Sequence, residues 1–260
     1  RRVARRRVFY IPGYDPIHPR RYRELYRKEG AAQASVSGYA VALEPKRGGG
    51  PYGWRATGRM DGAEVVADVE VLVWSDIVRE SMSGGIAATY GQLLRTAWTY
   101  IASGALRRLM WLRKGPVIAA LYPVGMLLLQ LLLAVGLGAL AGWLLVLGLR
   151  TAGAPTGGWA WALRLAVLAA VAVPVLRWFR SRDGRFYAYY LMHDYAFSAC
   201  WGGANPPALE ARMAEFRRLV AAALAEDGID EVLVVGHSSG AHLAVSVLAD
   251  LIRAGEGPRD

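Results

Sequence analysis

The strongest constraint on the fold is Val117–Leu149, a stretch of 33 residues without a charged side chain. A helix needs about 20 apolar residues to cross the hydrocarbon core of a bilayer, so this stretch is long enough to span it. Its most polar side chain is Gln130. Ala134, Gly138 and Gly142 recur at a spacing of four residues, which lets another helix approach closely in lipid. We therefore expect a transmembrane helix with a tightly packed partner.

The expected partner is the alanine-rich segment Trp159–Phe179. Arg164 and Arg177 leave 12 uncharged residues between them, a length that is also typical of a re-entrant helix. Both arginines lie near the ends of the segment, where long side chains can extend to the interface and restore a 21-residue span. Tryptophans suited to interfacial anchoring lie at its two ends: Trp159, Trp161 and Trp178. We interpret the pair as a transmembrane hairpin, with a re-entrant or interfacial second helix as the alternative.

Basic residues flank the two expected helices unevenly. Arg150 and Arg164 lie near the link between the helices, whereas eight basic residues lie at the other ends. The eight are Arg107, Arg108, Arg113, Lys114, Arg177, Arg180, Arg182 and Arg185. Because basic residues near membrane helices stay in the cytoplasm, this distribution puts both flanks there. The sequence predicts a protein of the inner (cytoplasmic) membrane. Its hairpin (residues 116–180, with helices at about 117–149 and 159–179) interrupts one cytoplasmic domain made of residues 1–115 and 181–260.

A second constraint lies near the end of the sequence, where a strand, a tight turn and a helix follow one another. Val232–Val235 is an apolar, mostly β-branched run that is typical of a buried strand. The next five residues, Gly236–Gly240, have the pattern Gly-x-Ser-x-Gly, and a helical pattern follows them. This order of elements is what a nucleophile elbow requires.

Each residue of this turn has an expected task. Ser238 is the candidate nucleophile, because a sharp turn lifts its hydroxyl out of the sheet towards a base. Gly236 and Gly240 let the strand and the helix approach where a side chain would clash, and His237 lies between glycine and serine. The backbone N–H of Ser239 is a candidate donor to a developing oxyanion.

Two further strands end in residues that suit the same edge of a sheet. Val8–Ile11 stops at a turn cluster in which Gly13 and Tyr14 can expose backbone N–H groups to an anion; the alternative is an ordinary strand-to-loop turn. A later apolar run ends at Trp74, just before Asp76. Ligands gather at the carboxyl ends of strands in open α/β sheets, so Asp76 is a candidate for the edge of the site. A helix N-cap is the alternative role for this carboxylate.

The pieces between these features complete a mixed pattern of helices and strands. We expect a helix at Arg20–Gln33 and strands at Gly38–Leu43, Tyr52–Met60 and Glu64–Trp74. Another helix is expected to start at Asn205, with one apolar face: Leu209, Met213, Phe216, Val220 and Leu224.

Taken together, these residues resemble the α/β-hydrolase superfamily. The resemblance covers residues 8–15 as the oxyanion-loop strand, 69–76 as the next parallel strand, and 205–254 as helix, elbow strand and elbow helix. It implies an α/β fold with a mainly parallel sheet and helices on both faces, interrupted here by the two-helix transmembrane hairpin. It also implies a serine nucleophile and oxyanion donors at the positions named above. The loop after the first strand is Pro-Gly-Tyr-Asp, whereas the family has a His-Gly-rich loop there.

In this family the acid and the histidine of the catalytic triad follow the serine in the chain. His242 is the only histidine after Ser238, and it should point along the elbow helix, so we expect it to pack. The carboxylates that follow the serine are Asp250, Glu256 and Asp260. We therefore expect the triad acid and histidine, with the C-terminal part of the fold, beyond residue 260. His18 is expected on the surface and His193 within a packed aromatic segment.

Composition limits the partners. The formal net charge is +10, but no nucleic-acid-binding module appears, so a lipid bilayer is the expected partner and nucleic acid is not. Arginine supplies all but three of the 31 basic residues, a bias that we associate with bacterial genomes. Arg1–Arg7 is expected to be a solvated basic arm, with contact to anionic lipid as the alternative. Cys200 is the only cysteine, so an intrachain disulfide or cysteine-rich zinc site is excluded, and we expect no metal and no cofactor.

Two functions follow from these expectations. The first is a membrane-anchored serine hydrolase of the esterase, lipase or thioesterase kind, in which Ser238 attacks the carbonyl of an acyl or lipid ester or thioester. The second is a non-catalytic membrane scaffold or partner-binding protein that keeps the elbow as architecture, because a fold does not fix a function.

Overall fold

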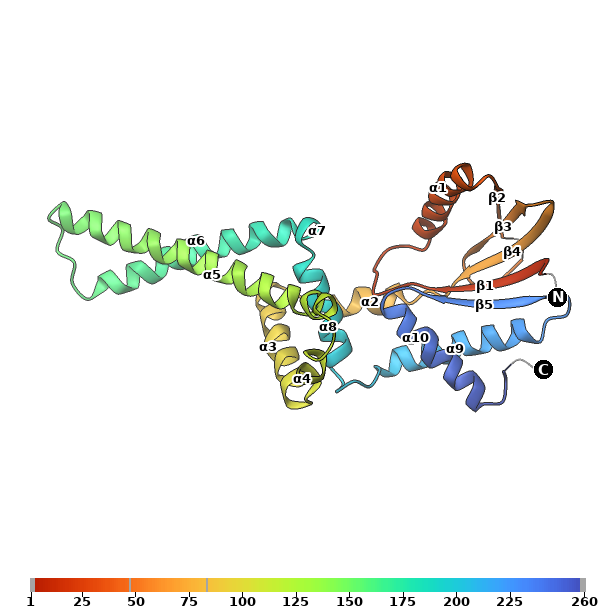
Figure 1. Ribbon diagram of the computed structural model, residues 1–260. Coiled ribbons are helices and arrows are strands. Elements are labelled where there is room, and N and C mark those ends of the chain that lie inside the picture. Colours follow the sequence, from red (N-terminus) through yellow and green to blue (C-terminus); the bar gives the residue numbers. More distant parts are fainter. Residues whose placement is uncertain (1–2, 47, 83, 258–260) are drawn as a thin grey trace. The chain divides into compact units, whose positions relative to one another are not determined.

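The computed structural model describes residues 3–46, 48–82 and 84–257. The chain forms two compact units, one of residues 1–81 and 205–260 and the other of residues 82–204 (Figure 1). These boundaries differ from the expected ones, because residues 82–115 and 181–204 belong to the same unit as the two hairpin helices. Their helices pack on one another and on the first hairpin helix.

The first unit is built on one five-stranded sheet in the spatial order β2-β3-β4-β1-β5. Its strands are β1 (Arg5–Ile11), β2 (Ala40–Pro45), β3 (Gly53–Met60), β4 (Ala63–Val71) and β5 (Glu231–Gly236). β1 pairs in parallel with β4 on one side and with β5 on the other, whereas β2, β3 and β4 pair antiparallel.

The expectation of a mainly parallel sheet is therefore wrong, and the sheet is mixed. The cause is the connection from β3 to β4, which consists of Asp61 and Gly62 alone. Both residues have positive φ, 51° and 71°, the backbone conformation of the tight turns that join antiparallel strands. A parallel pair would need a crossover of a dozen or more residues.

Helices cover the two faces of this sheet (Figure 1). Helix α1 (Arg20–Ser37) lies over one face, where the ring of Tyr22 packs on Tyr10 with 5.3 Å between centroids. Helices α9 (Pro207–Leu224) and α10 (Ser239–Arg253) pack on each other at the opposite face, and α10 contacts β1 and β5. Four of the five residues expected on the apolar face of α9 are buried: Leu209, Met213, Phe216 and Val220. This helix prediction is confirmed.

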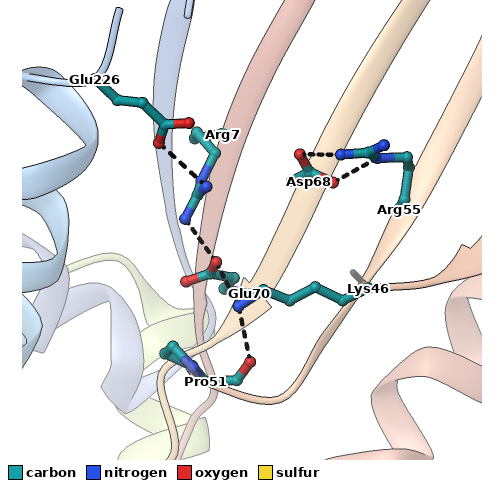
Figure 2. A network of polar contacts seen from close by, with 7 residues as sticks. All are labelled: Arg7, Lys46, Pro51, Arg55, Asp68, Glu70 and Glu226. Carbon is teal, nitrogen blue, oxygen red and sulfur yellow. Dashed lines mark hydrogen bonds and ion pairs between the residues drawn. The ribbon is translucent and has the colours of Figure 1, made fainter. Parts of the chain in front are cut away.

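A polar network ties β1, β4 and two connecting segments together (Figure 2). Glu70, on β4, is 1% exposed, and its Oε1 accepts hydrogen bonds from Arg7 at 2.6 Å and from Lys46 at 2.8 Å. Arg7 also donates to Glu226 at 3.2 Å, and Lys46 Nζ donates to the carbonyl of Pro51. The interior of this side of the sheet is thus partly ionic.

These contacts correct the prediction of a solvated basic arm at the N-terminus. Arg5–Ile11 is a strand, Arg6 pairs with Glu231, and Arg7 is bound by two carboxylates. The three consecutive arginines hide the alternation of a strand, and the carboxylates that pair with Arg6 and Arg7 are far away in the sequence. Arg1 and Arg2 lie outside the described residues.

The second unit contains two long apolar helices, α5 (Lys114–Thr151) and α6 (Trp159–Ser181). Both are long and apolar enough to cross a membrane. Only 22% and 11% of their most apolar stretches are buried, whereas the core helix of a water-soluble domain would be mostly covered. A Cβ at Gly138 would lie 2.7 Å from the carbonyl oxygen of Leu168, and one at Gly142 would lie 3.0 Å from that of Arg164. The predicted close approach of the two helices at the small residues is confirmed.

Shorter helices surround the base of this helix pair. They are α3 (Ile86–Ala102), α4 (Ala105–Leu109), α7 (Asp183–Phe186) and α8 (Ala188–Ala199), while α2 (Ser75–Ser81) belongs to the first unit. The core of the second unit joins α3, α5 and α8 through Leu93, Leu127, Tyr189 and Met192.

Candidate active site

The turn after β5 holds Ser238 in an unusual backbone conformation. Its φ of 54° and ψ of −126° lie outside the regions that a residue with a side chain normally adopts. Ser238 is exposed and directly precedes α10, so strand and helix meet at this residue. Such strain costs on the order of 1–3 kcal/mol and persists only when the surrounding structure imposes it.

The surrounding structure imposes the turn through its two glycines. A Cβ at Gly236 would lie 2.5 Å from Cα of Ala241 and from the carbonyl oxygen of Gly240. A Cβ at Gly240 would overlap the carbonyl oxygens of Ile11 and Pro12. Both glycines are therefore required by close backbone packing, as expected for the elbow pattern.

The turn after β1 lies directly against the elbow. The N–H of His237 donates to the carbonyl of Ile11 at 3.1 Å. Gly13 is buried, and a Cβ placed on it would lie 3.0 Å from Cβ of Ser238. The structure thus brings together the serine and the glycine turn, two features separated by more than 200 residues in the sequence. Ser239 is the first residue of α10, at the positive end of the helix dipole.

Tyr14 and Trp74 hold the glycine turn in place. The Tyr14 side chain is 2% exposed, and its hydroxyl shares a 2.6 Å hydrogen bond with Ser81. Trp74 is also 2% exposed and donates through Nε1 to the carbonyl of Pro12 at 2.8 Å. The sequence marks Trp74 only as the end of an apolar run, and nothing in it indicates this contact.

The site occupies the position where open α/β sheets bind ligands. After β1 the chain forms β2, β3 and β4 on one side of β1, and it later returns to form β5 on the other side. In open α/β sheets, ligands bind outside the carboxyl ends of the strands at such a reversal of strand order. The turn at Gly13 and the elbow at Ser238 both follow those ends.

Asp76 follows the carboxyl end of β4 in the sequence, but its carboxylate is already bound. Both of its oxygens accept hydrogen bonds from Arg212 of α9, at 3.0 and 2.7 Å, and this pairing lowers the pKa of Asp76. Arg212 also donates to the carbonyl of Val73 at 2.6 Å. The carboxylate therefore fastens α9 to the end of β4, and it lies in the first turn of α2, where acidic residues favour the helix dipole.

None of the four histidines, all of which are described, makes a hydrogen bond with the Ser238 side chain in this structure. His237 and His242 are exposed, so the expectation that His242 packs is wrong. His18 is exposed, as expected, and its Nδ1 accepts from the N–H of Arg20. His193 is 7% exposed in the second unit, and burial, together with the charge of Arg180, lowers its pKa.

The described carboxylates after the serine are engaged elsewhere. Asp250 pairs with Arg253 at 2.9 Å, and Glu256 pairs with Arg217 at 3.4 Å. Asp260 lies outside the described residues. The location of a triad acid and histidine beyond residue 260 stays a prediction.

A groove of about 540 Å³ lies between α1 and the sheet, a volume typical of small-molecule sites. Tyr22 and Tyr26 of α1 line one wall. The strands line the other wall with aliphatic and aromatic side chains, among them Val8, Tyr10, Trp54, Leu233 and Val235. Val235 pairs with Tyr10 one residue before these strands end, so the groove runs to the carboxyl edge at which Ser238 follows. Sequence periodicity marks these residues as apolar, but it does not show that a helix leaves them partly uncovered.

Within the described residues, no cluster of three or more histidine, cysteine, aspartate or glutamate side chains is arranged to hold a metal ion. The chain matches no family model, no curated protein and no solved structure.

Proposed function

We propose that the protein is a membrane-anchored serine hydrolase in which Ser238 attacks the carbonyl of an acyl ester or thioester. The observation that carries the proposal is the strained, exposed Ser238 at the end of a parallel strand, held between two glycines that admit no side chain. Strain at an exposed nucleophile is typical of an active site, because an ordinary loop relaxes it.

Backbone groups near the serine supply the second part of the mechanism. As Ser238 Oγ bonds to the carbonyl carbon, the carbonyl oxygen gains negative charge. The N–H of Ser239 at the helix N-terminus and the N–H groups of the turn at Gly13 or Tyr14 are the candidate donors to that oxygen. The structure supports this assignment through the short approach of the Gly13 turn to the elbow.

The proton of Ser238 needs a base, and the described histidines do not supply one. We propose that the base, and the acid that orients it, follow residue 260, because both come after the serine in the α/β-hydrolase superfamily that these residues resemble. The elbow would then be completed by later strands of the same domain. This placement makes the activity a property of the full-length protein.

The two membrane-type helices support a lipid or acyl substrate. A domain carried by two bilayer-spanning helices meets acyl chains at high local concentration, and the apolar groove beside α1 suits such a chain. We place both flanks of the hairpin in the cytoplasm from the distribution of basic residues. Reporter fusions at Gly153 and Glu226 test this orientation, and a cytoplasmic signal from Gly153 would contradict it.

A fluorophosphonate probe tests the nucleophile in membranes that contain the full-length protein. We expect covalent labelling that is abolished in Ser238→Ala. Two matched controls each remove a different serine hydroxyl near the site and leave Ser238 unchanged. Ser239→Ala retains the backbone N–H, and Ser246→Ala removes a hydroxyl that donates to the His242 carbonyl on the same helix. Labelling should persist in both controls, and labelling that survives Ser238→Ala would refute the proposal.

A non-catalytic scaffold is the second candidate, and two observations favour it. The described histidines make no bond to Ser238, and Asp76 is committed to Arg212. A full-length protein that lacks a histidine after later strands, and does not react with the probe, would fit this candidate.

A further inference from the structure

The outer face of α3 is apolar and exposed. Leu94, Trp98 and Ile101 recur at helical spacing on one face, and they are 71%, 69% and 60% exposed. The opposite face, with Thr89, Leu93 and Thr96, is buried. Since α3 packs on α8, the exposed stripe lies on the side of α3 away from that helix. Large apolar side chains in such a stripe mark a contact surface rather than chance exposure.

A second exposed apolar group follows α4, just before the first membrane-type helix begins at Lys114. Met110, Trp111 and Leu112 are 54%, 76% and 55% exposed. The guanidinium of Arg107 lies 5.7 Å from the ring centre of Trp111. We call these residues, together with the stripe on α3, the α3–α4 face.

The charged residues of the segment that forms the α3–α4 face have one sign. Residues 84–115 contain no aspartate or glutamate, and every basic side chain among them is exposed. These basic residues are Arg95, Arg107, Arg108, Arg113 and Lys114. Apolar and aromatic side chains beside basic ones match the interfacial region of an anionic bilayer.

A hydrogen bond holds the start of α3 against the C-terminal end of α6, which carries aromatic and basic residues. Arg180 of α6 donates to the carbonyl of Gly84 at 2.6 Å, two residues before α3 begins. At the same end of α6, the guanidinium of Arg182 lies 4.2 Å from the ring centre of Trp178, a pair suited to the boundary between lipid and water. Figure 1 shows α3 running across the direction of the α5–α6 pair. An α6 that spans the bilayer therefore holds α3 near the level of the headgroups.

We propose that the α3–α4 face is a docking surface for anionic phospholipid. The face lies flat on the bilayer, where the membrane helices leave it. The apolar stripe enters the boundary between headgroups and acyl chains, and the basic side chains bind phosphate groups. A protein partner would not need the position beside the membrane helices or a segment, residues 84–115, that contains basic residues and no carboxylate. The proposal depends on α5 and α6 lying in a bilayer, and it is independent of the chemistry of Ser238.

A dye at position 98 tests the proposal in the whole chain. Trp98→Cys in a Cys200→Ser background gives one thiol, which is labelled with an environment-sensitive dye. The protein is reconstituted in vesicles of phosphatidylcholine alone or mixed with phosphatidylglycerol, with nitroxide lipids as quenchers. The matched control is the same dye on the native Cys200, an exposed residue at the end of α8. We expect strong quenching at position 98 with phosphatidylglycerol, less without it, and little at Cys200.

Charge variants separate lipid docking from simple proximity. Arg107→Gln with Arg108→Gln should weaken docking by about fivefold for each cation, and added salt should weaken it as well. The proposal is overturned if the dye at position 98 stays in water in both vesicles. It is also overturned if quenching does not change with lipid charge, with added salt or with replacement of Arg107 and Arg108. A dye signal that follows the protein-to-lipid ratio rather than the quencher would show contact between copies and would equally contradict it.

Discussion

Replacing Glu70 by glutamine removes the one negative charge at the centre of the network in the first unit while it keeps the side-chain shape. The Glu70 side chain is 2% exposed and is bound by Arg7 and Lys46, whose side chains are 21% and 12% exposed. Loss of a charge-assisted hydrogen bond costs about 1.5–3 kcal/mol, and breaking a buried ion pair costs about 3–5 kcal/mol. Arg7 keeps Glu226 and Lys46 keeps the Pro51 carbonyl, so we expect the low end, about 3 kcal/mol.

Amide hydrogen exchange in the full chain, followed by mass spectrometry of β1 and β4 peptides, measures this loss. A decrease of about 3 kcal/mol in the free energy of opening corresponds to exchange that is about 100-fold faster. The matched control is Glu64→Gln on the same strand. Glu64 pairs with Arg59 at 2.7 Å, but the two side chains are 50% and 73% exposed, so its loss should cost about 0–1 kcal/mol.

Equal exchange rates in the Glu70 and Glu64 variants would refute the reasoning, because burial would then not determine the cost. The triple variant Glu70→Leu, Arg7→Met, Lys46→Met gives a second check. Apolar replacement of a whole buried ionic cluster is often neutral, so this variant should recover much of the protection that Glu70→Gln loses.

Three further predictions concern the elbow, the hairpin and acid sensitivity. Ser238→Gly should slow exchange in α10 by relieving the positive φ, a gain of about 1 kcal/mol, while it abolishes probe labelling; faster exchange would show that the turn is unstrained. Gly138→Val should lower the melting temperature of the helix pair in micelles, because its Cβ would meet the Leu168 backbone, whereas Gly136→Val, which has open space, should not; equal effects would contradict the close contact. The hydrogen bond from Arg55 lowers the pKa of Asp68 in the folded protein. This pair therefore stabilises the fold fully above the ordinary aspartate pKa of about 4, and its contribution is lost as the pH falls through the lowered pKa. Asp68→Asn should therefore flatten the acid side of the stability profile, and an unchanged profile would count against the pair.

The sequence predicted best those features that depend on local spacing. The contact between the helices of the hairpin followed from Gly138 and Gly142, because small residues four apart lie on one helix face. The glycines of the elbow follow from another local pattern, Gly-x-Ser-x-Gly between a strand and a helix, where a side chain would clash with the neighbouring backbone. The β-strands were located, but the direction in which they pair was not, since an alternating pattern is the same in parallel and antiparallel sheets.

Features that join distant parts of the chain were missed. Nothing near Asp76 indicates that Arg212, 136 residues later, binds its carboxylate. The sequence alone predicts a solvated arm at Arg1–Arg7, because the partners of Arg6 and Arg7 are far away in the sequence: Glu70, Glu226 and Glu231. The base of the proposed reaction is not identified by any local pattern in the chain.

The unit that contains the sheet is discontinuous in sequence, and this has a consequence for biosynthesis. β1 is a central strand in the folded protein, yet its neighbour β5 is synthesised about 160 residues after β4, a delay of roughly 10–30 s at ordinary translation rates. During that interval the apolar strand β1 is an open edge that can pair with other chains. The two membrane-type helices emerge from the ribosome in the same interval. Arrival of β5 covers the open edge of β1 and forms the serine turn in one step, so the candidate nucleophile is created only after the hairpin has been made.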